Sequence, residues 1–129
     1  MCIAFKKKGK TYKPGQSIEV ETDEGPLTRP WASYARSERM EYWTRQRYAM
    51  PVWIFAESFA ERDRLSQELV WETIPEGYAI RAFLAAPKDP EDFLILPDPE
   101  CYILTRAATA PEVQYFGHDR LPLLEERRS

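Results

Sequence analysis

The only histidine of the chain, His118, lies in the tight sequence Gly117-His118-Asp119-Arg120-Leu121-Pro122. An imidazole titrates near neutral pH, so it can give or take a proton where other side chains need help. The stretch from Pro111 to Phe116 predicts about two helical turns, which Gly117 would end. His118 would then follow the end of an element, where functional side chains are often presented. A surface or capping histidine is equally compatible with this stretch.

Cys2 follows Met1 directly. A small second residue lets an aminopeptidase remove Met1, which leaves a free α-amine and a thiol on one residue. The amine, with a pKa of about 7.7–8.0, condenses with an aldehyde to a Schiff base, and the thiolate, with a thiol pKa of about 8.5, can then close a five-membered thiazolidine. The alternative is a small buried hydrophobic residue in a first strand.

The chain contains, in this order, the stretches Met1-Cys2, Tyr34 to Glu38, Ile54 to Glu61, Ile103 to Thr105 and His118 to Pro122. Their order and approximate spacing resemble the SOS response-associated peptidase (SRAP, DUF159) family. Members of that family begin Met-Cys-Gly-Arg, carry an Asn-Ala-Arg-x-Glu segment and have a late His-Asp/Asn-Arg-Met/Leu-Pro motif. The resemblance implies a shortened, divergent member that shields abasic sites in single-stranded DNA through a covalent link to the terminal cysteine.

Carried over residue by residue, the resemblance implies that Cys2, Glu61 and His118 are catalytic. Glu61 would take the proton of the incoming amine, and His118 would protonate the sugar ring oxygen or contact a flanking phosphate. Arg36 and Arg120 would contact phosphates, for which a guanidinium offers a planar fork of donors. Without the family, Glu61 would be predicted to be a solvated glutamate in a charged turn.

The chain departs from the family pattern at several positions. Tyr34 stands where the family has asparagine, and Ile3-Ala4 replace the Gly-Arg after the cysteine. Trp31 and Tyr34 are candidates to stack on DNA bases, a sequence-tolerant way to hold single strands. Core packing is the alternative for both aromatic residues.

Two other functions are open. One is a non-catalytic SRAP-like module that binds nucleic acid or a protein, which the altered asparagine and the net charge of −3 favour. The other is a thiol autopeptidase that uses Cys2 and His118, for which no orienting Asn or Asp is visible. Whether the protein is an enzyme is therefore not decided by the sequence.

Composition predicts one globular domain over residues 1–129. The chain is 43% hydrophobic and contains eleven prolines, which favours a packed core and short strands over long helices. No stretch approaches about 20 apolar residues, and no hydrophobic signal core precedes the lysines at 6–8, so we expect a soluble, cytoplasmic protein that contacts no membrane.

The chain has two cysteines and no CxxC pair. We expect no disulfide, no metal and no cofactor. The oligomeric state stays open.

Charge is distributed unevenly along the chain. Residues 1–48 carry ten Lys/Arg against six Asp/Glu, a balance of +4, and residues 49–129 carry eight against fifteen, a balance of −7. Contacts with single-stranded DNA should therefore be local rather than spread over the protein.

The order of elements predicts an α+β domain, mainly an antiparallel mixed sheet, with one clear helix capped by Ser37 and one short helix at 111–116. Residues 23–30 are expected to form a loop, and residues 57–64 a turn or bulge. Two strands are expected around the turn at 74–77, and residues 93–96 are expected to pair with 101–105.

Overall fold

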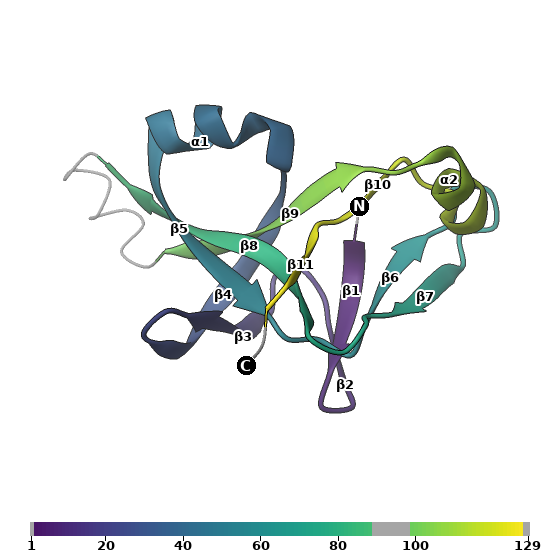
Figure 1. Ribbon diagram of the computed structural model, residues 1–129, viewed down its shortest axis with the longest axis horizontal. Coiled ribbons are helices and arrows are strands. Elements are labelled where there is room, and N and C mark those ends of the chain that lie inside the picture. Colours follow the sequence, from purple (N-terminus) through teal and green to yellow (C-terminus); the bar gives the residue numbers. More distant parts are fainter. Residues whose placement is uncertain (1, 89–98, 128–129) are drawn as a thin grey trace.

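The computed structural model describes residues 2–88 and 99–127, with strands dominating (Figure 1). Its strands are β1 (Cys2–Lys7), β2 (Lys10–Tyr12), β3 (Ser17–Thr22), β4 (Gly25–Arg36), β5 (Arg47–Ile54), β6 (Ser58–Arg62), β7 (Leu69–Thr73), β8 (Tyr78–Pro87), β9 (Glu100–Ala107), β10 (Arg120–Pro122) and β11 (Leu124–Glu126). The helices are α1 (Met40–Gln46) and α2 (Ala110–Phe116), and a 3-10 turn η1 (Ser37–Arg39) precedes α1. The predicted α+β class is confirmed.

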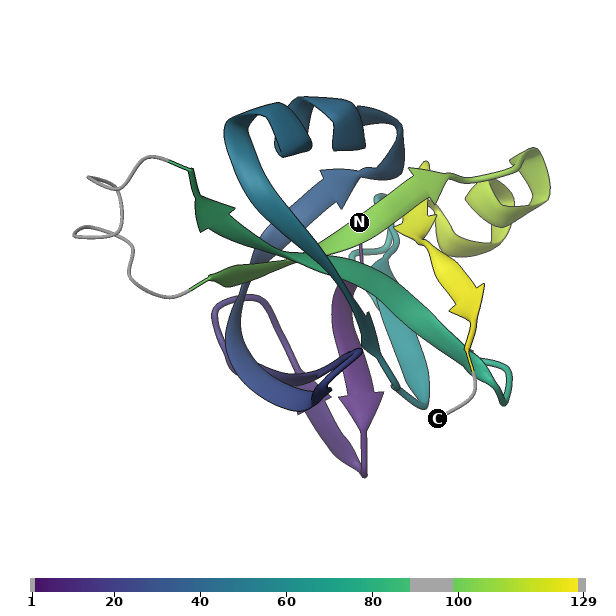
Figure 2. The same ribbon diagram turned by 60° about the vertical axis from the view of Figure 1, so that its left-hand side comes forward.

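Five of the strands close into a barrel in the order β9-β4-β3-β5-β8, because β8 also pairs with β9. Only the β4–β9 pairing is parallel among these neighbours. Figure 2 shows β8 and β9 running alongside each other before they diverge. The short strands β10 and β11 pair with the diverging parts of β9 and β8, respectively. Leu123 lies between them: its backbone N–H donates to the Leu104 carbonyl, and its carbonyl accepts the Arg81 N–H.

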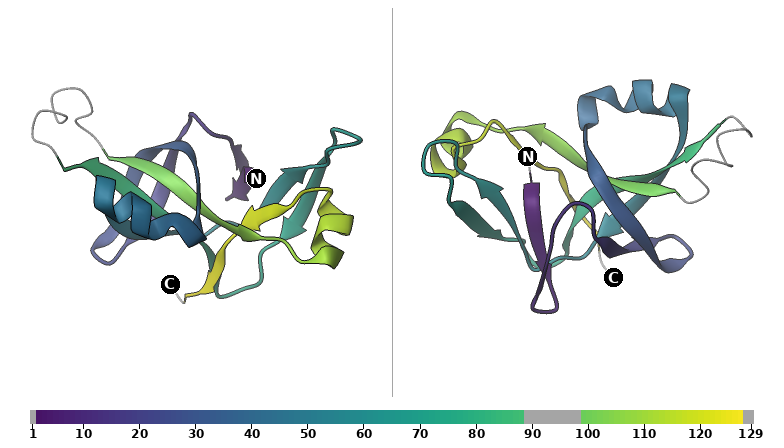
Figure 3. Two further views of the ribbon diagram at one scale, coloured as in Figure 1. Left: turned by 90° about the horizontal axis from the view of Figure 1, so that it is seen from above. Right: turned by 180° about the vertical axis from the view of Figure 1, so that it is seen from behind.

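A second, antiparallel sheet with the order β2-β1-β6-β7 lies beside the barrel (Figures 1 and 3). It shares the barrel's core, since Phe5 and Phe59 belong to the same buried cluster as Val52 and Ile103. The ring centres of Phe5 and Trp31 lie 5.2 Å apart across this junction. Because this one buried cluster spans both sheets, they form a single domain.

The two helices differ in how they begin. Thr109 and Glu112 form a capping box at the start of α2, and Gly117 ends this helix with φ 67°, as predicted. The predicted cap at Ser37 is wrong: its hydroxyl donates to the Glu38 carboxylate, and residues 37–39 form the 3-10 turn instead.

The loop predicted at 23–30 is wrong, because β4 already begins at Gly25. Its prolines fit a strand for a geometric reason. The N–H of Trp31 donates to the Gln16 carbonyl on the β3 side, and successive N–H groups alternate sides, so the nitrogens of Pro26 and Pro30 face away from β3. On that side β9 pairs with β4 only from Trp31 onward, so neither proline removes a bond between strands.

The turn predicted at 57–64 is also wrong: residues 58–62 form β6, which pairs with β1 on one edge and β7 on the other. Its partner β1 is distant in sequence, so the local charge pattern concealed the strand. Residues 74–77 connect β7 in the small sheet to β8 in the barrel rather than joining a hairpin. The expected strand at 93–96 lies outside the described residues.

Candidate functional site

A β-bulge sets the position of Cys2 on the small sheet. Phe5 pairs with Phe59 and Ala4 with Ala60, but the register then shifts and Cys2 pairs with Glu61. An unbroken register would have placed Cys2 opposite Arg62. Bulges of this kind often occur beside active sites, where they change which residue faces which. The bulge therefore brings two of the predicted catalytic residues together on adjacent strands.

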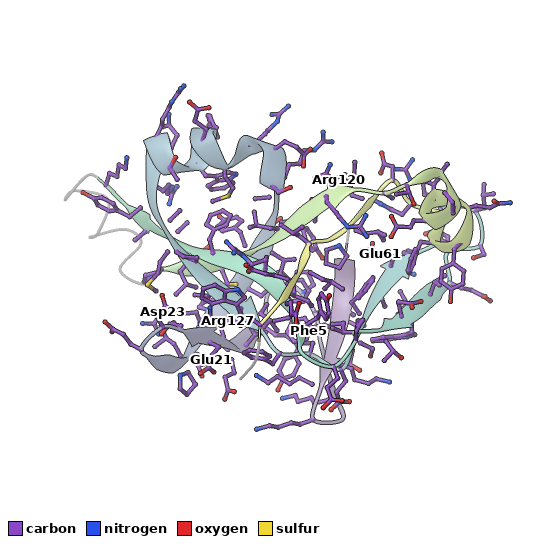
Figure 4. All side chains as sticks on the ribbon, viewed as in Figure 1. Phe5, Glu21, Asp23, Glu61, Arg120 and Arg127 are labelled. Atoms are coloured by element: carbon purple, nitrogen blue, oxygen red, sulfur yellow. The ribbon has the colours of Figure 1, made fainter. Side chains whose placement is uncertain are left out.

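Glu61 is fully buried, with 0% of its surface exposed, although it was expected to be solvated without the family context. Residues alternate sides along a strand, so Glu61 shares the inward face of β6 with the core residue Phe59. Burial raises the pKa of Glu61 to about 7, and the positive charge at the amino end of the chain acts in the opposite direction. A carboxyl group in this state exchanges protons near neutral pH. Figure 4 shows Glu61 on the inner side of the small sheet.

His118 lies in the connection between α2 and β10, with 16% of its side chain exposed. Its Nδ1 accepts the backbone N–H of Arg120 at 3.1 Å. A ring nitrogen that accepts a hydrogen bond carries no proton, so this hydrogen bond favours the neutral tautomer with its proton on Nε2. Burial lowers the pKa of His118. The ring is therefore suited to donate a hydrogen bond through Nε2 near neutral pH.

The loop that follows β6 is fastened to the His118 segment. A Cβ at Gly117 would collide with the Asp63 carboxylate, so the two segments touch closely. The Arg64 backbone N–H donates to the Gly117 carbonyl at 3.4 Å, and the Arg64 guanidinium donates to Asp119 Oδ1 at 2.7 Å. We call Asp63, Arg64, Gly117 and Asp119 the clasp. It fixes the segment that carries His118 to the end of β6.

The structure thus gathers three stretches that are far apart in sequence at one edge of the molecule. These are the start of β1 with Cys2, the end of β6 with Glu61, and the loop of His118 before β10. Strands β1 and β10 contact each other, and the views in Figures 1 and 3 place the amino end of β1 beside β10.

Arg120, which was predicted to contact phosphates, is engaged in hydrogen bonds within the fold. Its guanidinium donates to both Glu38 carboxylate oxygens at 2.9 Å, and to the Thr105 carbonyl at 2.7 Å and the Thr105 hydroxyl at 3.1 and 3.2 Å. The residue is 8% exposed. Hydrogen bonding to Arg120 lowers the pKa of Glu38 to about 2. The arginine joins η1, β9 and β10, and its donors are directed into the protein.

The remaining candidate residues differ in their exposure to solvent. Trp31 is fully buried in the core, so no face of its indole is open to a base. Tyr34 is half-buried and packs edge-on to Trp31, with ring centres 5.7 Å apart. Arg36 is exposed at the end of β4, beside Thr105 of β9. Of the four predicted DNA contacts, Arg36 is the one whose side chain is exposed.

The clasp and the Glu38–Arg120 pair were not predicted. Both join residues more than 50 positions apart, at 64 and 119 and at 38 and 120. Asp63 and Arg64 belong to a charged run that looks solvated in the sequence. No local pattern marks such pairs.

Searches of family models, curated proteins and solved structures find no match to this chain. In the described part of the chain, no helix is long and apolar enough to cross a membrane. Residues 2–88 and 99–127 also contain no group of three potential side-chain metal ligands.

Proposed function

We propose that this protein captures abasic sites in single-stranded DNA covalently through Cys2, as the resemblance to the SRAP family implies. The observation that supports this most directly is the pairing of Cys2 with Glu61, a fully buried carboxyl group whose pKa is raised to about 7. A proton-exchanging group thus lies on the strand next to the candidate nucleophile. A cytoplasmic location is part of the proposal.

The reaction requires removal of Met1, which frees the α-amine of Cys2. The amine attacks the aldehyde carbon of the ring-opened sugar, and the resulting carbinolamine loses water to give an iminium. The thiol then adds to the iminium carbon and loses its proton, closing a thiazolidine. Glu61 takes a proton from the attacking amine and returns one to the departing hydroxyl, which a carboxyl group with a pKa near 7 can do in both directions.

The geometry favours a hydrogen-bonding role for His118 over proton transfer. Protonating the sugar ring oxygen would require an imidazolium, and burial lowers the pKa of His118. The neutral ring, with Nδ1 accepting from the Arg120 backbone, keeps Nε2–H as its donor. His118 would then hold a sugar hydroxyl or phosphate oxygen in place while Glu61 exchanges the protons.

The test is denaturing electrophoresis with labelled abasic and intact oligonucleotides. We expect a heat-stable adduct between the mature protein and abasic DNA only. Cys2→Ser keeps the amine and should give only a Schiff base that borohydride traps. This variant also retains the thiol of Cys101, a buried control cysteine. Retaining Met1 should abolish the stable adduct, and Glu61→Gln should slow it at least tenfold. Absence of an adduct with the mature protein would refute the proposal.

A non-catalytic binding module is the second candidate, because Arg120 is engaged within the fold and Trp31 is buried. These placements remove two of the contacts expected for gripping a damaged strand. This alternative predicts equal, reversible binding of abasic and intact strands, with no dependence on Cys2. The autopeptidase alternative predicts cleavage of a peptide preceding Cys2, which mass spectrometry of the purified protein would detect.

A further inference from the structure

The hairpin of β1 and β2 carries the densest positive charge of the chain. Residues 6–13 contain five lysines and no acidic residue. Lys7 pairs with Lys10 across the strands, which leaves Lys8 and Gly9 as a two-residue turn. Lys8, Lys10 and Lys13 are exposed. We call residues 6–13 the lysine hairpin.

The turn residue Lys8 has an unfavourable backbone conformation. Its φ is 51° and that of Gly9 is 77°, so both turn positions are left-handed. Two-residue hairpin turns of this kind favour Asn-Gly or Asp-Gly, and a long side chain at the first position costs free energy. Within the described residues, Gln67 is the one other non-glycine with a positive φ. The sequence therefore places a cation at the tip where asparagine would suit the turn better.

The surroundings of these lysines contain more aromatic rings than carboxylates. Among the described residues, Lys7 is the one hairpin lysine in a salt bridge, with Glu19 at 3.0 Å. Lys6 Nζ lies 4.7 Å from the ring centre of Trp71, and Lys10 Nζ lies 5.2 Å from that of Tyr12. Cations next to partly exposed aromatic rings are typical of surfaces that hold phosphates and stack on bases.

The hairpin and the candidate site are joined by one strand. Cys2 and Lys7 are the two ends of β1, which at ~3.3 Å per residue separates them by roughly 17 Å. At an axial rise of ~3.4 Å per nucleotide of a stacked strand, this distance covers about five nucleotides. A strand held at Cys2 and running along β1 would bring its flanking phosphates to the lysines.

We propose that the lysine hairpin is a docking surface for the phosphate backbone of single-stranded DNA on one flank of the captured site. The role as a flank contact rests on the proposed function, whereas binding of undamaged single strands by the hairpin does not. Residues 49–129 carry a negative balance, so the attraction for phosphates is concentrated in the first third of the chain. Each lysine acts as a point charge that releases counterions from the strand.

The first test measures binding of an undamaged, labelled oligothymidylate by fluorescence anisotropy over a range of salt concentrations. Lys8→Asn should weaken binding several-fold and reduce the salt slope by about 0.7, while the melting temperature stays equal or rises because asparagine suits the turn. The triple variant, which combines Lys8→Asn with Lys10→Gln and Lys13→Gln, should weaken DNA binding further. Lys88→Gln is the matched control: Lys88 is exposed but contacts Thr44 and Tyr48 beside α1. Unchanged affinity in the triple variant would overturn the proposal.

The second test separates this inference from the proposed function. In Cys2→Ser, which cannot form the stable adduct, binding of undamaged strands should keep its dependence on the hairpin lysines. If the mature protein forms no adduct with abasic strands while this dependence is intact, covalent capture alone is refuted. In the mature protein, the triple variant should slow adduct formation with long-flanked abasic strands and leave the rate with one-nucleotide flanks unchanged. Equal slowing for both lengths would overturn the flank contact, as would tighter lysine-dependent binding to phosphatidylserine vesicles than to DNA.

Discussion

Two buried charged residues, Arg120 and Glu61, show how similar burial can serve different ends. Arg120 is 8% exposed and Glu61 0% exposed. Arg120 retains its charge by bonding to Glu38 and Thr105, and the pKa of Glu38 is correspondingly lowered to about 2. Burial instead raises the pKa of Glu61 to about 7. The first arrangement stabilises a junction of three elements, and the second holds a proton that can be exchanged.

The largest effect should come from Arg120→Ala. The substitution removes hydrogen bonds that link η1, β9 and β10 and leaves the buried Thr105 hydroxyl without its donor, so we expect a loss of about 2–4 kcal/mol in the free energy of unfolding. Urea denaturation measures this loss. Arg36→Ala, an exposed arginine beside the same junction, should change stability by less than about 0.5 kcal/mol. A stable Arg120→Ala variant with weakened DNA binding would reverse the roles that we assign to the two arginines.

The contrast between these residues shows which information the sequence contains. The strand at 17–22 and the helix that Gly117 ends were predictable because alternation and a left-handed glycine are local signals. The burial of Glu61 was not, because it depends on β1, which pairs with β6 from a distant part of the chain. The motif order indicated Cys2, Glu61 and His118 as a group. It could not reveal that the motif arginine Arg120 bonds to Glu38 within the fold.

Glu61→Gln should raise the free energy of unfolding at alkaline pH, a smaller effect that is opposite in sign to that of Arg120→Ala. Because burial raises the pKa of Glu61 in the folded state, the ionised form is disfavoured, and the wild type should lose stability as pH rises from about 4.5 to about 7. The amide does not ionise, so at pH 8 the variant should be more stable by about 1–3 kcal/mol. Thermal unfolding of both proteins at pH 5 and pH 8 measures the difference. If the variant is less stable at both pH values, the Glu61 carboxylate takes part in a structural ion pair, as the Glu38 carboxylate does with Arg120.

The smallest effect concerns the charges around His118, which lies two residues before Arg120 and is linked by the clasp to the strand of Glu61. Burial lowers the pKa of His118 most, the amino end of the chain and Arg64 lower it further, and Asp119 raises it. Arg64→Gln should therefore raise the pKa of the imidazole, and Asp119→Asn should lower it. Because His118 is the only histidine, one imidazole signal in an NMR titration reports both shifts without any DNA.

The opposite signs make this titration informative. The Arg64 and Asp119 side chains are 61% and 59% exposed, so their effect on His118 should weaken at high salt. If the clasp acted only by shielding the ring from water, either substitution would admit solvent and both would raise the pKa. Opposite shifts that diminish with salt would show that the clasp controls the charge of His118, and through it the fraction of molecules with a neutral Nε2–H donor at neutral pH.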